Sequence, residues 1–151
     1  MPKSLKPGPA TRRAGEPGDP MTESTLDSPF ASRYGSPAMR ALWSEAHKRR
    51  LWRQLWVALA EAQAKAGLVS PEQVADLQAH AARLNTERAL EIERQIGHDV
   101  MAEVRAFAEQ CPVGGGILHW GATSADITDN ADVLRQMQAL ALLRLLLFPL
   151  L

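Results

Sequence analysis

Apolar positions recur at helical spacing through most of the chain from residue 36 onward. The pair Ser36–Pro37 is typical of a helix start, and a long helical pattern runs from it to Gly67, a typical C-terminal cap. One face of this pattern carries five apolar residues: Trp52, Leu55, Trp56, Leu59 and Ala62. We expect this face to be buried, and we interpret the two tryptophans as core residues rather than as a stacking platform.

Two shorter helices are predicted next. Ser70 and Gln73 form a capping box, in which each side chain bonds the free amide of the other residue, so a helix begins there and runs to about Ala82. A second helix begins at Thr86, in a segment that mixes acidic and basic residues. Neither segment has the alternating, β-branched pattern of a strand.

The last two helices flank a segment that breaks the helical pattern. One begins near His98 or Asp99 and is ended by Pro112 and the glycines at 114–116. Its apolar stripe consists of Val100, Val104, Phe107, Ala108 and Cys111. The other helix follows Thr123–Ser124 and runs into the leucine-rich end of the chain. Because no strand-like pattern occurs, the sequence predicts an all-α fold.

The last helix becomes apolar around its whole circumference toward residue 151. A helix of this kind is normally buried among others, so we expect either that a partner chain covers it or that the polypeptide is a fragment, and we favour the fragment. The isolated chain should therefore self-associate. Arg144 interrupts the apolar run, which is shorter than the roughly 20 residues of a membrane span, so we predict no membrane insertion.

Composition narrows the function classes. The chain has 151 residues, enough for one domain with a core, and its 17 acidic and 17 basic residues balance, which argues against a nucleic-acid partner or a membrane surface. The basic run at 47–50 is interpreted as a solvated helix face. Cys111 is the only cysteine, which favours a reducing, cytoplasmic location. The four histidines and this cysteine lack zinc-ligand spacing, so no metal is predicted.

Two pairs of polar residues are candidate ligand contacts. Arg33 and Tyr34 precede the cap at Ser36, and a guanidinium with a phenol suits a phosphate or carboxylate; the alternative is an ordinary surface pair in a loop. His98 and Asp99 lie at a helix start, where the dipole lowers the pKa of histidine and favours a neutral ring that donates and accepts. The alternative is that these two residues only cap the helix.

The segment "GGGILHWGATS" is the third candidate. The glycines at 114–116 allow the backbone to approach a ligand closely. Thr123 and Ser124 offer hydroxyls and free amides at a helix N-terminus, which suit a carboxylate, and His119 lies four residues earlier. The alternative is that Ser124 is a plain N-cap after a glycine hinge.

These candidates fall within three stretches that resemble the adenylosuccinate lyases, a branch of the fumarase/aspartase superfamily. The stretches are "SRYGSPAMRALWSE" at 32–45, "HDVMAEVRAFAEQCP" at 98–112 and "ILHWGATSADITDN" at 117–130. The resemblance extends over about residues 28–143, in the order of the N-terminal part of that family. It is specific through the combination of the three stretches.

The resemblance implies an N-terminal helical domain that leads into a long-helix bundle, assembled as a homotetramer whose active sites combine residues of several subunits. It also implies elimination of fumarate from adenylosuccinate and from the succinyl-carboxamide ribotide of purine synthesis, with no metal or cofactor. Four regions are expected. They are a disordered tail at 1–29, rich in proline, glycine and charge, a helical domain at 30–112, an active-site loop at 113–122, and the truncated first bundle helix at 123–151.

The resemblance also implies roles at the nucleotide end of the substrate. Arg33 and Tyr34 hold this end, and His98 and Asp99 line the same part of the site. One departure affects it, because Gly97 stands where the family often has a polar or basic residue, so one substrate contact is expected to be missing.

At the other end of the substrate, Thr123 and Ser124 hold the succinyl carboxylates, and His119 orients the substrate. The family's general acid, a later histidine, and its general base, a serine on a mobile loop, are expected beyond residue 151. β-Elimination needs both groups, so the chain alone is expected to be inactive.

Three hypotheses stay open from the sequence. The chain is the N-terminal part of a lyase, or a non-catalytic fragment that still binds a nucleotide or another subunit, or a helical structural protein whose polar segments are only caps. Nucleotide binding separates the third hypothesis from the others, and fumarate release separates the first from the second.

Overall fold

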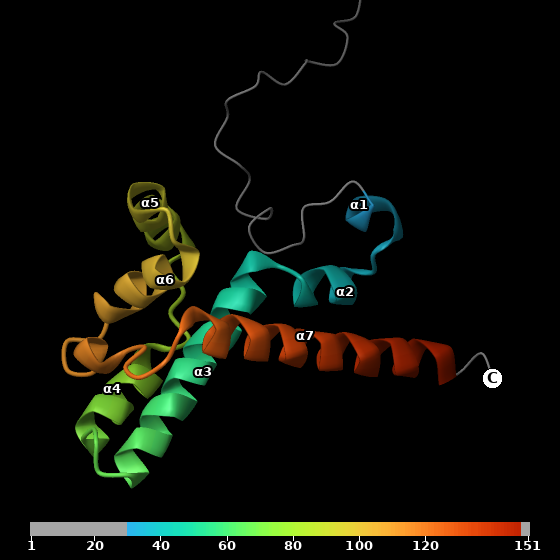
Figure 1. The fold of residues 1–151 in the computed structure, drawn as a ribbon. Helices are drawn as coiled ribbons and strands as arrows, with labels where there is room; N and C mark the ends of the chain where they lie inside the picture. The colour runs from blue at the N-terminus through green and yellow to red at the C-terminus, as the bar shows by residue number, and fades with distance from the viewer. Residues whose placement is uncertain (1–29, 149–151) are drawn as a thin grey trace, which may run out of the picture.

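The computed structural model describes residues 30–148, which are helical and contain no strand, as the sequence predicts (Figure 1). The predicted tail at 1–29 and the last three residues lie outside this range. The helices are α1 (Ala31–Tyr34), α2 (Pro37–Leu42), α3 (Glu45–Lys65), α4 (Pro71–His80), α5 (Thr86–Ile96), α6 (Asp99–Ala108) and α7 (Ser124–Leu147), with a 3-10 turn, η1, at Gly115–Ile117. No helix of the described range is long and apolar enough to cross a membrane.

The long helix predicted from Ser36 is divided into α2 and α3 at Ser44. The Ser44 hydroxyl donates to the carbonyl of Ala41 at 2.7 Å and accepts from the amide of His47 at 3.2 Å, so it ends one helix and begins the next. At the far end, Gly67 adopts φ 72° and the amide of Leu68 bonds the Gln63 carbonyl at 2.9 Å. This is a Schellman motif, which confirms the predicted C-terminal cap.

The main core lies where α3 packs against α4, α6 and the start of α7. Trp52 and Trp56 are buried within it, which confirms their interpretation as core residues. Only part of the predicted apolar face is covered, since Leu55 and Leu59 are half-buried and Ala62 is exposed. The buried side of the C-terminal half of α3 runs through Ala60 instead, which belongs to the same core cluster.

The remaining predicted helices form close to their capping signals. Ser70 and Gln73 make the capping box that begins α4, which ends at His80, two residues before the predicted end. Asn85 caps α5 through the Arg88 amide, and Gly97 ends α5 in the left-handed conformation, φ 66°. α5 and α6 then pack as an antiparallel pair around small apolar residues: Ala89, Ile92, Ala102 and Ala106.

A buried ion-pair cluster joins α3 to α6. Glu103 accepts from Arg49 Nη1 at 2.9 Å and from Arg53 Nε at 2.7 Å, and none of the three side chains is more than 2% exposed. The Arg53 guanidinium also lies 4.4 Å from the centroid of the Phe107 ring. The prediction that residues 47–50 form a solvated face is therefore wrong for Arg49, because a carboxylate 54 residues later neutralises it inside the protein.

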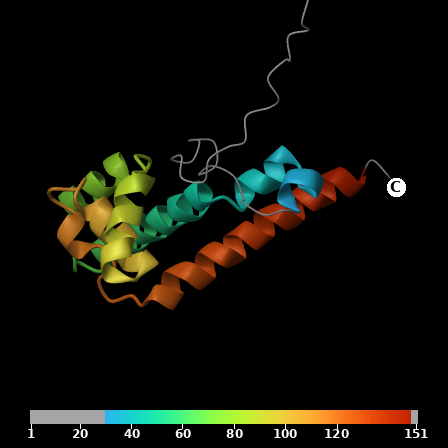
Figure 2. The same cartoon turned by 90° about the horizontal axis from the view of Figure 1, so that it is seen from above.

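α7 packs along one side only. Its buried positions recur every four residues and face α2 and α3: Ile127, Ala131, Arg135 and Ala139. Figure 2 shows α2 beside the middle of α7, and Arg135 lies 4.6 Å from the Trp43 ring centroid. α7 also exposes a set of apolar residues that extends around the helix toward its C-terminal end, and we call this set the α7 apolar face: Val133, Met137, Leu140, Leu143, Leu145, Leu146, Leu147 and Phe148.

Candidate functional site

The candidate site is built around the segment from 113 to 124, which connects α6 to α7. Its first two glycines are required by packing within the chain. A Cβ atom on Gly114 would lie 2.5 Å from the Gln73 carbonyl oxygen, and one on Gly115 would lie 2.7 Å from that of Ala108. A Cβ on Gly116 would meet nothing within 4 Å. Of the three glycines predicted to approach a ligand, two thus fit the loop against α4 and α6.

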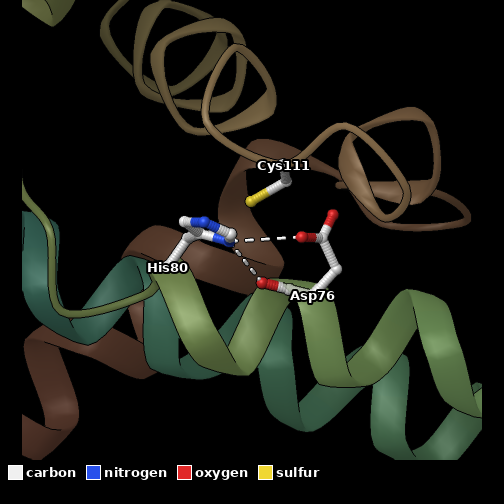
Figure 3. A group of neighbouring side chains, drawn as sticks. All are labelled: Asp76, His80 and Cys111. Atoms are coloured by element: carbon white, nitrogen blue, oxygen red, sulfur yellow. Dashed lines mark hydrogen bonds and ion pairs between the residues drawn. The ribbon is translucent and has the colours of Figure 1, made fainter.

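Asp76 of α4 holds the beginning of this loop. Its Oδ2 accepts from the amides of Val113 and Gly114, at 2.8 Å each, and its Oδ1 lies 3.2 Å from His80 Nδ1 (Figure 3). The hydrogen bonds from these amides, Gly114 first, lower the pKa of the Asp76 carboxyl, and the nearby His80 adds to this effect. A charged acceptor at this point fixes the path of the loop toward α7.

Asp76, His80 and Cys111 bring together three atoms of the kinds that bind metal ions, within 4.8 Å of one another (Figure 3). Each group already has a function in the fold. His80 Nδ1 donates to the carbonyl of Asp76 at 2.8 Å, and the Asp76 carboxylate accepts the two loop amides. Burial, with the charge of Asp76, raises the pKa of the Cys111 thiol to about 11, so the thiolate that a metal requires is disfavoured. We interpret this group as part of the loop's support.

His98 is the N-cap of α6 and reaches the start of α7. Its Nδ1 accepts from the amide of Met101 at 3.4 Å, which leaves Nε2 to face the Ser124 hydroxyl oxygen at 3.5 Å. Asp99 is half-exposed, and its Oδ1 accepts from the amide of Val100 at 2.7 Å. His98 thus both caps a helix and contacts a candidate substrate-binding residue, whereas Asp99 makes local contacts.

His119 is held from the core side by Trp56. The indole Nε1 donates to His119 Nδ1 at 3.2 Å, and the two rings meet edge-on with centroids 6.1 Å apart. Burial lowers the pKa of His119, with Asp126 opposing this effect and His98 adding to it. His119 also has φ 66°, the only positive φ among the non-glycine residues that the structure describes.

The start of α7 differs from a simple hydroxyl-lined anion site. Thr123, not Ser124, is the N-cap. Its amide and its hydroxyl both donate to Asp126 Oδ2, at 2.7 and 3.1 Å, and these bonds lower the pKa of Asp126. The Ser124 hydroxyl instead faces His98. A substrate carboxylate that used both hydroxyls would therefore have to displace Asp126 from Thr123.

Arg33 and Tyr34 lie apart from these residues. They form the end of α1 rather than a loop, both are exposed, and the Tyr34 ring stacks on Phe30 with centroids 6.4 Å apart. Figures 1 and 2 place α1 toward the C-terminal end of α7 and farther from it than α2, whereas the 113–124 loop lies beyond the N-terminal end of α7. The structure thus brings His98 and Ser124 into contact, and His119 lies close enough to His98 for the charge of one to act on the other. Arg33 and Tyr34 lie elsewhere.

Sequence reasoning did not identify Trp56, Asp76 and Asp126 as parts of this site. Asp126 had a local signal, because an acid three residues after a threonine is a capping-box pattern. Asp76 had a weaker one, since it stands four residues before His80 on the same helix face. Trp56 had none, because its contact with His119 spans 63 residues.

Comparisons with known proteins agree with the sequence motifs. No protein-family model matches the chain. The chain is 40% identical over 111 residues to the adenylosuccinate lyase of Saccharomyces cerevisiae, a match that covers 71% of this chain and 23% of that protein. It is 42% identical over 109 residues to the adenylosuccinate lyase of Methanocaldococcus jannaschii, covering 70% and 24%. The chain spans about a quarter of the length of these curated relatives.

Solved structures support the same grouping. A fumarate lyase from Mesorhizobium sp. BNC1 matches with a TM-score of 0.64 and 33% identity, over 70% of this chain and 25% of that one. The 3-carboxy-cis,cis-muconate lactonizing enzyme of Pseudomonas putida matches with a TM-score of 0.70 and 30% identity, over 78% and 28%. Sequence and fold together confirm the predicted resemblance.

Proposed function

We propose that the chain supplies part of the active site of a carbon–nitrogen lyase in purine nucleotide synthesis. The proposal rests on its sequence similarity to the adenylosuccinate lyases. The reaction is elimination of fumarate from adenylosuccinate and from the related succinyl-carboxamide ribotide. The observation that carries the proposal is the contact between His98, which caps α6, and Ser124, the first residue of α7, beside the loop that carries His119.

The residues around the loop suit the succinyl end of such a substrate. The Ser124 hydroxyl can donate to a carboxylate at the N-terminus of α7, where the helix dipole favours negative charge. The Nε2 of His119 can donate to a substrate when Nδ1 accepts from Trp56, and the Nε2 of His98 faces the Ser124 hydroxyl. In this proposal Asp126 releases Thr123 when a substrate carboxylate takes its place.

Arg33 and Tyr34 are proposed to hold the nucleotide end of a substrate bound mainly by another subunit. Their exposure and their distance from the loop support this division, because a site shared among copies of the chain would need them on the surface. We accordingly propose a homotetramer in the cytoplasm, with the α7 apolar face covered by other helices.

Both proton transfers of the elimination are assigned to residues outside 30–148. β-Elimination needs a general base for the proton next to the carboxylate and a general acid for the nitrogen. The residues around the loop are given binding and orienting roles, so the proposal leaves both proton-transfer roles to other segments.

The test is to titrate the 151-residue chain with adenylosuccinate, following binding by calorimetry and fumarate release by an enzymatic assay. Ser124→Ala serves as the variant and Ser36→Ala, an N-cap far from the loop, as its control. Binding that Ser124→Ala weakens supports the proposed site. Binding without fumarate release is the expected result for this chain, because both proton-transfer groups are assigned elsewhere. No binding at millimolar substrate would contradict the proposal.

A further inference from the structure

We propose that Trp56 is a positioning residue that holds His119 as the neutral tautomer protonated on Nε2, so that Nε2–H is the group His119 presents to substrate. This inference rests on the proposed function for its use, but the tautomer itself can be tested without catalysis. Trp56 is buried in the core and His119 is half-buried in the loop, so their hydrogen bond connects the core to the site.

The tautomer follows from the hydrogen-bonding capacity of the two side chains. The indole N–H of Trp56 can only donate, so the nitrogen that it contacts, His119 Nδ1, must be an acceptor. A neutral imidazole with Nδ1 as acceptor carries its proton on Nε2. Protonation of the whole ring would place two donors against each other across the 3.2 Å contact, which the structure disfavours.

The other charged or titratable groups near His119 do not determine which of its ring nitrogens carries the proton. Asp126, at the start of α7, favours the protonated ring, while His98, at the start of α6, disfavours it. Neither is bonded to a ring nitrogen of His119 among the described residues, so neither selects between Nδ1 and Nε2. Within residues 30–148, Trp56 is the one residue whose directional contact distinguishes the two nitrogens.

Backbone geometry indicates that the imidazole has a use at this place. A non-glycine residue at φ 66° is in a left-handed conformation that L side chains rarely adopt. Two residues later Gly121 adopts a similar φ, 73°, which glycine reaches without steric cost because it has no Cβ atom. A histidine that is held in this conformation and oriented by an indole donor is better explained as a fixed hydrogen-bond donor to substrate than as a residue that only connects two segments.

The experiment records long-range proton–nitrogen NMR correlations of the histidine rings in the 151-residue chain, with His119 assigned from a His119→Gln variant. We expect an unprotonated Nδ1 and a protonated Nε2 near neutral pH. Trp56→Phe keeps an aromatic ring but removes the donor, so it should give a mixture of tautomers. The pKa of His119 should rise by roughly half to one unit, the equivalent of one neutral hydrogen bond.

Trp52→Phe is the matched control, because Trp52 is buried one turn earlier on α3 and its ring lies under Lys48. It should leave the His119 tautomer and pKa unchanged. The proposal is overturned if Trp56→Phe has the wild-type tautomer and pKa, or if wild-type His119 carries its proton on Nδ1. The proton position of wild-type His119 is measured without a Trp56 variant, so it tests the proposal even if Trp56→Phe does not fold.

Failure of the proposed function would look different. If adenylosuccinate does not shift the His119 resonances while the Nε2-protonated tautomer is present, the substrate assignment fails and the role of Trp56 in fixing the tautomer stands. If the substrate binds but His119 is protonated on Nδ1, the positioning role fails alone.

Discussion

Glu103→Gln should destabilise the protein more than any other single charge change on α6. Glu103 is the shared partner of two guanidiniums, Arg49 at 2.9 Å and Arg53 at 2.7 Å, and all three side chains are essentially out of contact with water. Replacing the carboxylate with an amide leaves two buried positive charges with one neutral acceptor between them. Removal of one member of a buried pair typically costs about 3–5 kcal/mol.

The contacts that Arg49 and Arg53 keep in the Glu103→Gln variant indicate a loss of stability in the lower part of that range. Arg49 keeps Glu93 at 3.2 Å. Arg53 keeps only neutral acceptors among the described residues, chiefly the Arg83 carbonyl at 2.8 Å and the Gln110 side chain at 3.2 Å. We therefore expect a loss of about 3 kcal/mol. For a chain of this size that corresponds to roughly 10–15 °C in Tm.

The assay is urea denaturation followed by circular dichroism at neutral pH and one fixed protein concentration, because self-association would alter the apparent stability. Glu109→Gln is the control. Glu109 also takes two bonds from one arginine, Arg88 at 2.7 and 2.9 Å, but both side chains are more than a third exposed, so its loss should be small. Equal losses for the two variants would refute the argument that burial makes the Glu103 pairs important.

Three further variants test other parts of the structure. Asp76→Asn should speed hydrogen exchange of the Gly114 amide by about tenfold, because a charged acceptor is lost. Because folding lowers the pKa of Asp76, its contribution to the free energy of unfolding is present above the unfolded-state pKa of about 3.9 and is lost as pH falls through the folded-state pKa. The urea midpoint of Asp76→Asn should therefore depend less on pH in that acid range than the wild-type midpoint does. The same pH dependence in both proteins would contradict this. In an assembly that turns over adenylosuccinate, Ser124→Ala should lower kcat/KM by a factor equivalent to about 1–3 kcal/mol of transition-state stabilisation. Unchanged turnover would remove Ser124 from the site. Leu146→Gln should weaken self-association in sedimentation, whereas a wild-type chain that sediments as a monomer would contradict the role of the α7 apolar face.

Local signals in the sequence predicted where most helices begin and end. Ser70 with Gln73 and the glycine at 67 act through atoms within about five residues, so their structural effect is readable from neighbouring letters. Ser44 was the exception, although it caps α3 in the same way. It stands inside an uninterrupted helical pattern, and the bend there lets Trp43 and the Leu42 carbonyl contact Arg135 of α7. That contact depends on packing 93 residues away.

The candidate site was predictable in its parts and not in its arrangement. The motifs named His98, His119 and Ser124, which the loop brings together, but they named Arg33 and Tyr34 equally, which lie elsewhere. A motif records that a residue type occurs, and only the folded backbone decides which motifs share one site.

The sequence by itself determined the all-α class, the glycine-rich connection and the family resemblance, because helical periodicity, capping and motif order are properties of neighbouring residues. Tertiary structure decided the burial of Arg49 and Arg53, since an arginine in a basic run is indistinguishable from a solvated one until Glu103 meets it. It also decided the state of His119. The proton position on that ring is set by an indole 63 residues earlier, and such a contact exists only once the two segments have packed.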